Sequence, residues 1–296
     1  MINIDGVLKK GIEILKNANN EAPVLEAGVM LCSVLKCDKA FLYSHNDHCM
    51  TREEFDFYIE QINQRASGKP LQYLTGHQEF MSLDFIVTPD VLIPRQDTEI
   101  LVETVINFAQ NLLNSRLPIA KSTSPELKIL DIGTGSGCIA VSLAHYLKNC
   151  KVTAVDISEK ALKIARLNAD KAGVADRIRF LQSNVLEQLE KDQYDIILSN
   201  PPYIPASDIK KLQIEVKDYE PIGALDGGAD GLDFYCKIVS EAPGFLKPDC
   251  LLAFEVGYDQ AQMVGRLMGQ CFDDIQIIKD LSGIDRVVTG KLLNVK

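Results

Sequence analysis

The chain has 296 residues, enough for a small and a larger domain, and 46% of them are hydrophobic, which can supply a buried core. Its formal net charge is −10. Proteins that bind nucleic acid through its phosphates are usually basic, so this charge argues against free DNA or RNA as the substrate.

The first residues, MINIDGVLKKGIEIL, lack a charged segment followed by an apolar one, and no run approaches the ~18 apolar residues of a membrane span. The eight cysteines show no close pairing, which is typical of reduced thiols in the cytoplasm. Cys32, Cys37, His45, His48 and Cys49 lie near one another, but they form no C-x2-C knuckle. We therefore expect a cytoplasmic protein with no metal site and no contact with a membrane.

Residues 1 to 70 have the spacing of three or four short helices. Apolar residues recur at helical intervals from Val7 to Leu15, and Pro23 suits the first turn of a second helix. Thr51 and Glu54 form the capping box of a third, and Gly68 suits its end. We expect residues 1–70 to form a helical bundle.

Residues 71–96 consist of short runs, LQYLTG, EFMSLDF and FIVTP, which predict extended structure and a β-hairpin linker. Helical spacing returns from residue 97 to about 113. The stretch from Asn114 to Glu126, rich in Ser and Pro, is predicted to be a loop.

From Leu127 onward strands and helices alternate. The predicted strands are LKILDI, KVTAVD, IRFLQS, DIILSN, LLAFEV, IQIIKD and RVVTGKL, the last two as an antiparallel pair, and Ser158 caps the helix after the second. Continuous apolar strands alternating with helices predict an α/β fold with a mostly parallel, seven-stranded, Rossmann-like sheet. We assign residues 97–296 to this domain.

A glycine-rich turn follows the first of these strands. It spans Gly133, Thr134, Gly135, Ser136 and Gly137, and glycines there let a backbone approach a ligand at the start of a helix. Asp156, at the end of the second strand, lies 21 residues after Gly135 and could hold a ribose hydroxyl. Both features suit NAD as well as S-adenosylmethionine.

Two further residues favour S-adenosylmethionine. Asp131 gives the D-x-G-x-G-x-G form, which resembles the cofactor loop of methyltransferases. Asn184 follows the third strand, where an adenine contact is expected. A NAD-dependent oxidoreductase remains the alternative for the turn alone.

The fourth strand ends in Asn200-Pro201-Pro202-Tyr203. Two prolines fix φ and remove two backbone donors, so the nearby carbonyls remain as acceptors. The Asn200 side chain and the Pro201 carbonyl could accept both hydrogens of a planar NH2 group, with Tyr203 packed against it. We therefore interpret Asn200, Pro201 and Tyr203 as catalytic residues for transfer of a methyl group to an amide or amino nitrogen.

Together with longer stretches such as GKPLQYLTGHQEFMSLDF and EPIGALDGGADGLDFY, these motifs resemble the release factor glutamine methyltransferase family. The resemblance implies that Gly133–Gly137, Asp156, Asn184 and Asn200 bind S-adenosylmethionine, leaving S-adenosylhomocysteine as product. It implies that Asn200, Pro201, Pro202 and Tyr203 hold the glutamine of a Gly-Gly-Gln motif in class I peptide chain release factors. We expect a monomer that binds no nucleic acid directly.

One departure from the family pattern is Gln96, which stands where the family has proline, and it is expected to loosen one turn. Two enzymes that share both motifs are rivals: a ribosomal-protein glutamine methyltransferase and an adenine N6-methyltransferase. The acidic charge counts against the second. A non-catalytic binding module would explain the helical bundle but not the glycine loop.

Overall fold

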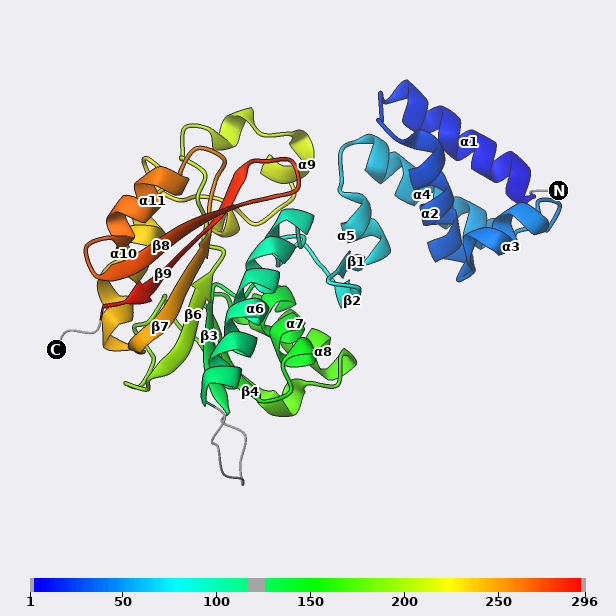
Figure 1. Cartoon of the computed structure of the whole chain (residues 1–296). Coiled ribbons are helices and arrows are strands. Elements are labelled where there is room, and N and C mark those ends of the chain that lie inside the picture. The colour runs from blue at the N-terminus through cyan, green and yellow to red at the C-terminus, as the bar shows by residue number, and fades with distance from the viewer. Residues whose placement is uncertain (1–2, 117–125, 294–296) are drawn as a thin grey trace. The chain divides into compact units, whose positions relative to one another are not determined.

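The computed structural model describes residues 3–116 and 126–293 (Figure 1). Contacts between Cα atoms divide it into two units. The helical unit comprises residues 1–77 and 212–219, and the sheet unit comprises residues 78–211 and 220–296. Among the described helices, none is long and apolar enough to cross a membrane.

The helical unit begins with five helices, α1 (Ile4–Asn17), α2 (Pro23–Leu35), α3 (Lys39–Ser44), α4 (Arg52–Ala66) and α5 (Leu71–Thr75), and the short α9 (Ile214–Lys217) also belongs to it. Pro23 begins α2 and Thr51 caps α4 through a complete capping box, as predicted. Tyr58, Ile62, Leu15 and Leu31 lie in its core. The prediction for residues 71–75 was wrong, because this run is α5, between Pro70 and a left-handed Gly76.

A two-stranded hairpin, β1 (His77–Phe80) and β2 (Leu83–Ile86), lies where a β-hairpin was predicted. A single 3-10 turn, η1 (Gln96–Thr98), leads into α6 (Glu99–Arg116). Residues 114–116 are therefore helical, where a loop was predicted, and the predicted loop residues 117–125 lie outside the described part of the chain. Gln96 starts η1, and Arg95 before it is anchored to Glu220 at 2.6 Å.

The main sheet has seven strands in the order β5-β4-β3-β6-β7-β9-β8. Their bounds are β3 (Leu127–Ile132), β4 (Cys150–Asp156), β5 (Ile178–Gln182), β6 (Tyr194–Ser199), β7 (Leu246–Glu255), β8 (Phe272–Lys279) and β9 (Asp285–Leu292). Neighbours from β5 to β7 pair in parallel, and β9 is antiparallel to both β7 and β8. This confirms the predicted seven-stranded, mostly parallel α/β sheet.

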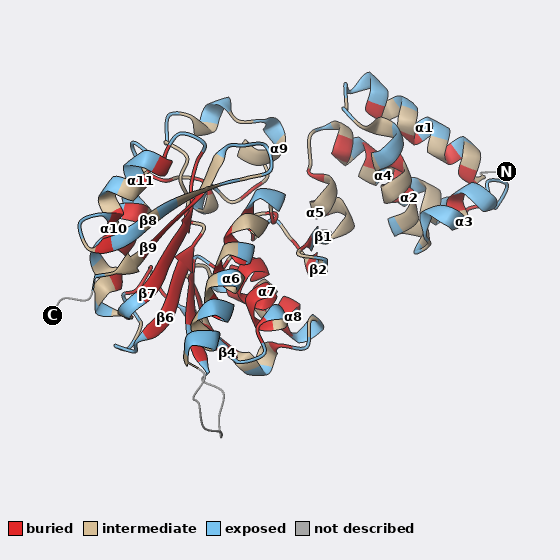
Figure 2. Ribbon diagram, in the orientation of Figure 1, coloured by how far each residue is buried: buried red, intermediate tan, exposed pale blue. Residues whose placement is uncertain are grey.

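Helices cover both faces of this sheet (Figure 1). One apolar core packs α6, α7 (Cys138–Tyr146) and α8 (Glu159–Lys171) on one face, and a second packs α10 (Asp233–Glu241) and α11 (Ala261–Met268) on the other. Figure 2 shows the central strands buried almost throughout, and all six residues of β6 are buried. This two-sided burial explains the continuous apolar runs of the parallel strands.

Chain order reverses between β3 and β6. The connection from β3 runs to β4 on one side, whereas β6 lies on the other side and leads to β7. In open α/β sheets, the loops that leave such strands diverge and open a crevice beyond their carboxyl ends. The glycine-rich turn and the Asn-Pro-Pro-Tyr segment follow these two strands.

Candidate active site

Strand register brings the key residues to one edge of the sheet. Ile132 is paired with Val155 in β4 and with Ser199 in β6. The next residues along these strands, Gly133, Asp156 and Asn200, therefore leave the sheet side by side. Ser199 Oγ donates to the Ile132 carbonyl at 2.7 Å and ties the ends of β3 and β6 together.

The glycine turn presents bare backbone. Gly133, Gly135 and Gly137 have φ values of 74°, 55° and 80°, which side chains disfavour. No atom lies within 4 Å of where a Cβ would stand at Gly133 or Gly135, so a ligand can approach the peptide plane there. A Cβ on Gly137 would instead lie 2.9 Å from the Ala165 Cβ, so this glycine lets α7 pack on α8.

Asp131 and the polar residues of the turn hold its shape from inside. Thr134 Oγ1 donates to Asp131 Oδ2 at 2.6 Å, and both side chains are buried. Burial raises the pKa of Asp131 to about 7. Ser136 is also buried, and its carbonyl accepts from Asn168 Nδ2 at 2.9 Å. The Asp131 and Thr134 side chains thus brace the loop from inside, whereas Ser136 contributes its backbone carbonyl.

Asp156 is the acid nearest the bare backbone. Its Oδ2 accepts from the Gly135 N–H at 2.9 Å, and its Oδ1 accepts from the Ser158 N–H at 2.8 Å. Burial raises the pKa of Asp156, and these backbone donors oppose that rise. Each carboxylate oxygen has a further lone pair, so this side chain can still accept from the hydroxyls of a ribose.

Asn184 lies in the loop after β5, and the structure gives its amide a local partner. Its Nδ2 donates to Glu187 Oε1 at 2.7 Å, and the residue is half-buried. The same loop is tied to β4 because the Ser183 N–H donates to the Asp156 carbonyl at 3.0 Å. Asn184 therefore sits two strands from the glycine turn, with its amide nitrogen already engaged.

The Asn-Pro-Pro-Tyr segment is held from behind by the loop that precedes α10. The Ile204 N–H donates to the Leu225 carbonyl at 3.0 Å, and the Gly227 N–H donates to the Ile204 carbonyl at 2.9 Å. A Cβ on Gly227 would lie 2.8 Å from the Pro202 oxygen and from the Tyr203 Cα. Gln260 Nε2 donates to the Tyr203 carbonyl at 2.9 Å. The segment is therefore rigid before any ligand binds.

Two residues that sequence reasoning missed contact Asn200. Asn200 Nδ2 donates to Thr98 Oγ1 at 3.2 Å, and both Thr98 and Asn200 lie within hydrogen-bonding reach of the Glu255 carboxyl. Burial raises the pKa of Glu255 to about 7, although these two hydrogen bonds and the Arg286 charge lower it. The sequence feature that could have identified Glu255 is its place at the end of a strand, because Glu255 ends β7 just as Asp156 ends β4.

This edge combines bare glycine backbone, an acid with free lone pairs and a stiff amide–proline corner. Such a set suits a nucleoside-containing ligand beside a planar nitrogen group. Across the described ranges, no three His, Cys, Asp or Glu side chains gather closely enough to hold a metal ion.

Comparison with known proteins identifies relatives of both units. Residues 6–76 match the PrmC N-terminal domain, and residues 95–215 match the methyltransferase small domain. The hMettl16 catalytic domain, solved with a MAT2A 3′UTR hairpin, superposes with a TM-score of 0.55 at 17% identity, covering 80% of this chain and 83% of that one. At this identity, the likeness supports the class I methyltransferase fold alone.

Two curated relatives span nearly the whole chain. The release factor glutamine methyltransferase of Geobacter sulfurreducens is 43% identical over 269 residues, covering 90% of this chain and 89% of the relative. The protein of the same name from Clostridium acetobutylicum is 39% identical over 290 residues, covering 97% and 98%. This chain therefore belongs to the release factor glutamine methyltransferase family.

Proposed function

We propose that this chain transfers a methyl group from S-adenosylmethionine to the side-chain amide nitrogen of the glutamine in the Gly-Gly-Gln motif of class I release factors. The observation that carries the proposal is the strand register, which sets Asn200 beside Gly133 at one edge of the sheet. The methyl donor above the glycine turn and the acceptor nitrogen at Asn200 would then lie beyond the ends of two neighbouring strands, β3 and β6. The family membership and the relatives' names support the substrate.

The glycine turn and Asp156 fit the cofactor. The open space at Gly133 and Gly135 lets the cofactor lie directly against the backbone. The Asp156 carboxylate offers acceptors for the cofactor's ribose hydroxyls. Asn184 can offer its carbonyl oxygen and its second amide hydrogen to the adenine while its first amide hydrogen stays on Glu187. When bound, S-adenosylmethionine supplies a methyl group on a positively charged sulfur and is left as S-adenosylhomocysteine.

The Asn-Pro-Pro-Tyr corner would orient the substrate amide. Asn200 Oδ1 and the Pro201 carbonyl accept its two hydrogens, which aims the nitrogen at the methyl group and favours the positive charge that develops on it. The nitrogen then loses one proton to water. Pro202 keeps the corner rigid, and Tyr203 packs against the amide plane. Burial raises the pKa of Tyr203 to about 12, so its hydroxyl stays protonated and does not act as a base.

The helical domain, residues 1–70, would help to dock the release factor, with residues 71–96 as a linker and residues 97–296 as the catalytic domain. We propose that the protein acts in the cytoplasm as a monomer. A ribosomal-protein glutamine methyltransferase is the second candidate, because the same corner would serve it equally. An adenine substrate would require a basic surface, whereas the formal charge of this chain is −10.

Mass spectrometry of a purified class I release factor tests the proposal. After incubation with the enzyme and S-adenosylmethionine, we expect the mass of one methyl group on the Gly-Gly-Gln glutamine. The Asn200→Ala enzyme should be at least about 100-fold slower, since it lacks one acceptor for the substrate amide. An unmethylated release factor, alongside methylation of a ribosomal protein tested in parallel, would assign the enzyme to the second candidate.

A further inference from the structure

One oxygen of the Glu255 carboxyl is buried without a hydrogen-bond partner. The residue is 1% exposed, and within the described residues its Oε2 accepts no hydrogen bond. Arg286 acts on it by charge, yet the guanidinium of Arg286 is paired with Asp97 at 3.0 Å and Asp280 at 3.2 Å. A buried carboxylate oxygen that accepts no hydrogen bond costs stability, so packing alone does not explain an acid at this position.

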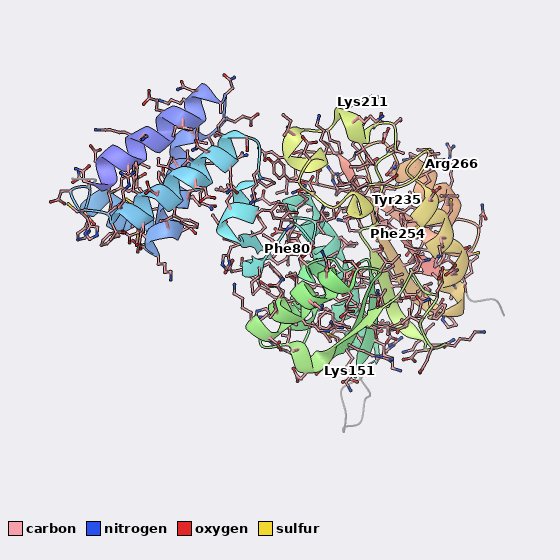
Figure 3. All side chains as sticks on the ribbon, turned by 180° about the vertical axis from the view of Figure 1, so that it is seen from behind. Phe80, Lys151, Lys211, Tyr235, Phe254 and Arg266 are labelled. Carbon is pink, nitrogen blue, oxygen red and sulfur yellow. The ribbon has the colours of Figure 1, made fainter. Side chains whose placement is uncertain are left out.

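The backbone of Glu255 is held firmly in place. Tyr235 Oη donates to the Glu255 carbonyl at 2.9 Å. The Tyr235 ring packs edge to face on Phe254 with 5.3 Å between centroids, and Figure 3 shows these two side chains together. Ser199 is paired with Phe254, so Asn200 and Glu255 are the next residues along neighbouring parallel strands. The carboxyl therefore has a defined position beside the Asn200 amide.

The Asn200, Thr98 and Glu255 side chains are placed so that they can form a directed chain of hydrogen bonds. Asn200 Nδ2 donates to Thr98 Oγ1, and the Thr98 hydroxyl can pass its own hydrogen to the Glu255 carboxyl. The second hydrogen of the Asn200 amide can reach the same carboxyl. Both acceptors lie on the nitrogen side of the amide, so its oxygen must face the other way.

We propose that Glu255 and Thr98 are positioning residues for methyl transfer: they hold both N–H bonds of the Asn200 amide and thereby present Asn200 Oδ1 to the substrate amide. The inference rests on the proposed function. Without these acceptors the Asn200 side chain can turn over about its Cβ–Cγ bond. It would then direct N–H donors at the substrate N–H groups, which repels the substrate nitrogen from its reactive position. A buried carboxylate also polarises the amide and strengthens Oδ1 as an acceptor.

Substitution of Glu255 tests this directly. Glu255→Met keeps the length of the side chain and removes both acceptor oxygens, so turnover should fall roughly 10- to 100-fold. Glu255→Gln keeps one acceptor and should lose less. Affinity for S-adenosylhomocysteine should stay within about twofold in both variants, because the glycine turn and Asp156 are untouched. A folded Glu255→Met enzyme with wild-type turnover would overturn the proposal.

Thr98 gives an independent test with a rescue. Thr98→Val removes the hydroxyl at nearly constant shape and should lower turnover about tenfold, whereas Thr98→Ser restores the hydroxyl and most of the rate. Asp97→Asn is the control, because Asp97 carries charge beside this group but its carboxylate is paired with Arg286. Equal losses in the Val and Ser variants, or a larger loss in Asp97→Asn, would contradict the chain of hydrogen bonds.

A double variant shows whether Glu255 acts through Asn200. If it does, adding Glu255→Met to Asn200→Ala should change the residual rate less than twofold, while independent effects would multiply. Multiplied losses would assign Glu255 a role of its own and reject positioning. The proposed function itself is judged separately by the wild-type enzyme, which must methylate the release factor whatever these variants do.

Discussion

At the scale of single residues, the ionisation of Glu255 predicts a pH-dependent stability. Burial raises the pKa of this carboxyl to about 7, above the usual 4.5. Between these values the folded protein binds more protons than the unfolded chain, so the free energy of unfolding decreases as pH rises. The charged and titratable groups facing it are Asp97 from η1, Arg286 from β9, Tyr203, Tyr235 from α10 and Cys138 from α7.

Glu255→Gln cannot ionise and should therefore gain stability relative to the wild type as pH rises. We expect similar melting temperatures near pH 5 and, at pH 8, an advantage for the variant on the order of 2 kcal/mol, or several degrees. Asp131 has a similarly raised pKa, but it is present in both proteins and its contribution cancels. Thermal unfolding between pH 5 and 8 measures the difference. A constant difference across that range would show that Glu255 does not titrate there.

Sequence pattern could identify some residues of the candidate site but not others. Asp156 and Asn200 could be placed because each ends a predicted strand next to a distinctive motif. Glu255 also ends a strand, but LLAFEV resembles a plain buried strand with an acid at its exit. Its contact with Asn200 depends on which strands are neighbours in the sheet, and local sequence does not determine strand order. Thr98 was hidden for the same reason, inside the start of a helix.

At the scale of secondary structure, prediction succeeded where patterns were long or capped. The seven strands and the caps of α4 and α8 were found because burial on both faces and capping residues leave strong local signals. Sequence pattern predicts an extended run for the five residues of α5, because so short an apolar run fits both helical and strand spacing. Pro70 before it and the left-handed Gly76 after it were the signals that could have decided.

Gly137 at the start of α7 lies against α8, so a side chain there would disturb the packing of the two helices. Gly137→Ala would combine a positive φ with a contact of 2.9 Å to the Ala165 Cβ. We expect a loss of about 2–4 kcal/mol in the free energy of unfolding and a cofactor affinity lowered about tenfold. Urea unfolding and calorimetry with S-adenosylhomocysteine measure both.

Gly173→Ala is the matched control, because Gly173 follows α8 with a φ of 68° but has open space around its missing side chain. It should cost only about 1–2 kcal/mol for the left-handed backbone and leave cofactor affinity unchanged. Equal losses in the two alanine variants would mean that helix contact at Gly137 contributes nothing.

At the scale of the whole molecule, the division into two units does not follow the chain in a simple way. Residues 212–219 belong to the helical unit, although they lie within the segment that continues from the Asn-Pro-Pro-Tyr corner. Sequence patterns assigned them to the catalytic domain, because an insertion of eight residues carries no signal of where it packs. The Ile214 side chain lies where a side chain on Gly68 would stand. Tyr219 Oη donates to the Ser67 carbonyl at 3.4 Å.

Arg65 joins this returning segment to the helical bundle. The side chain is 7% exposed, contacts Glu26 through two nitrogens at 2.6 and 3.1 Å, and reaches Glu215 at 2.7 Å. Arg65→Ala would leave Glu26, which is 15% exposed, without its cation, and we expect a loss of about 2–4 kcal/mol in the helical unit. Arg52→Ala is the control, since its pair with Asp56 is solvent-exposed and should contribute less than about 0.5 kcal/mol.

Hydrogen exchange separates the two links that Arg65 makes. In Arg65→Ala, amides of α2, α4 and residues 212–219 should exchange faster, because the arginine ties all three together. In Glu215→Gln the two contacts between Arg65 and Glu26 remain, so faster exchange should be confined to residues 212–219. If exchange in that segment matches the wild type in both variants, Ile214 and Tyr219 alone hold it, and the buried arginine serves only the pairing of α2 with α4.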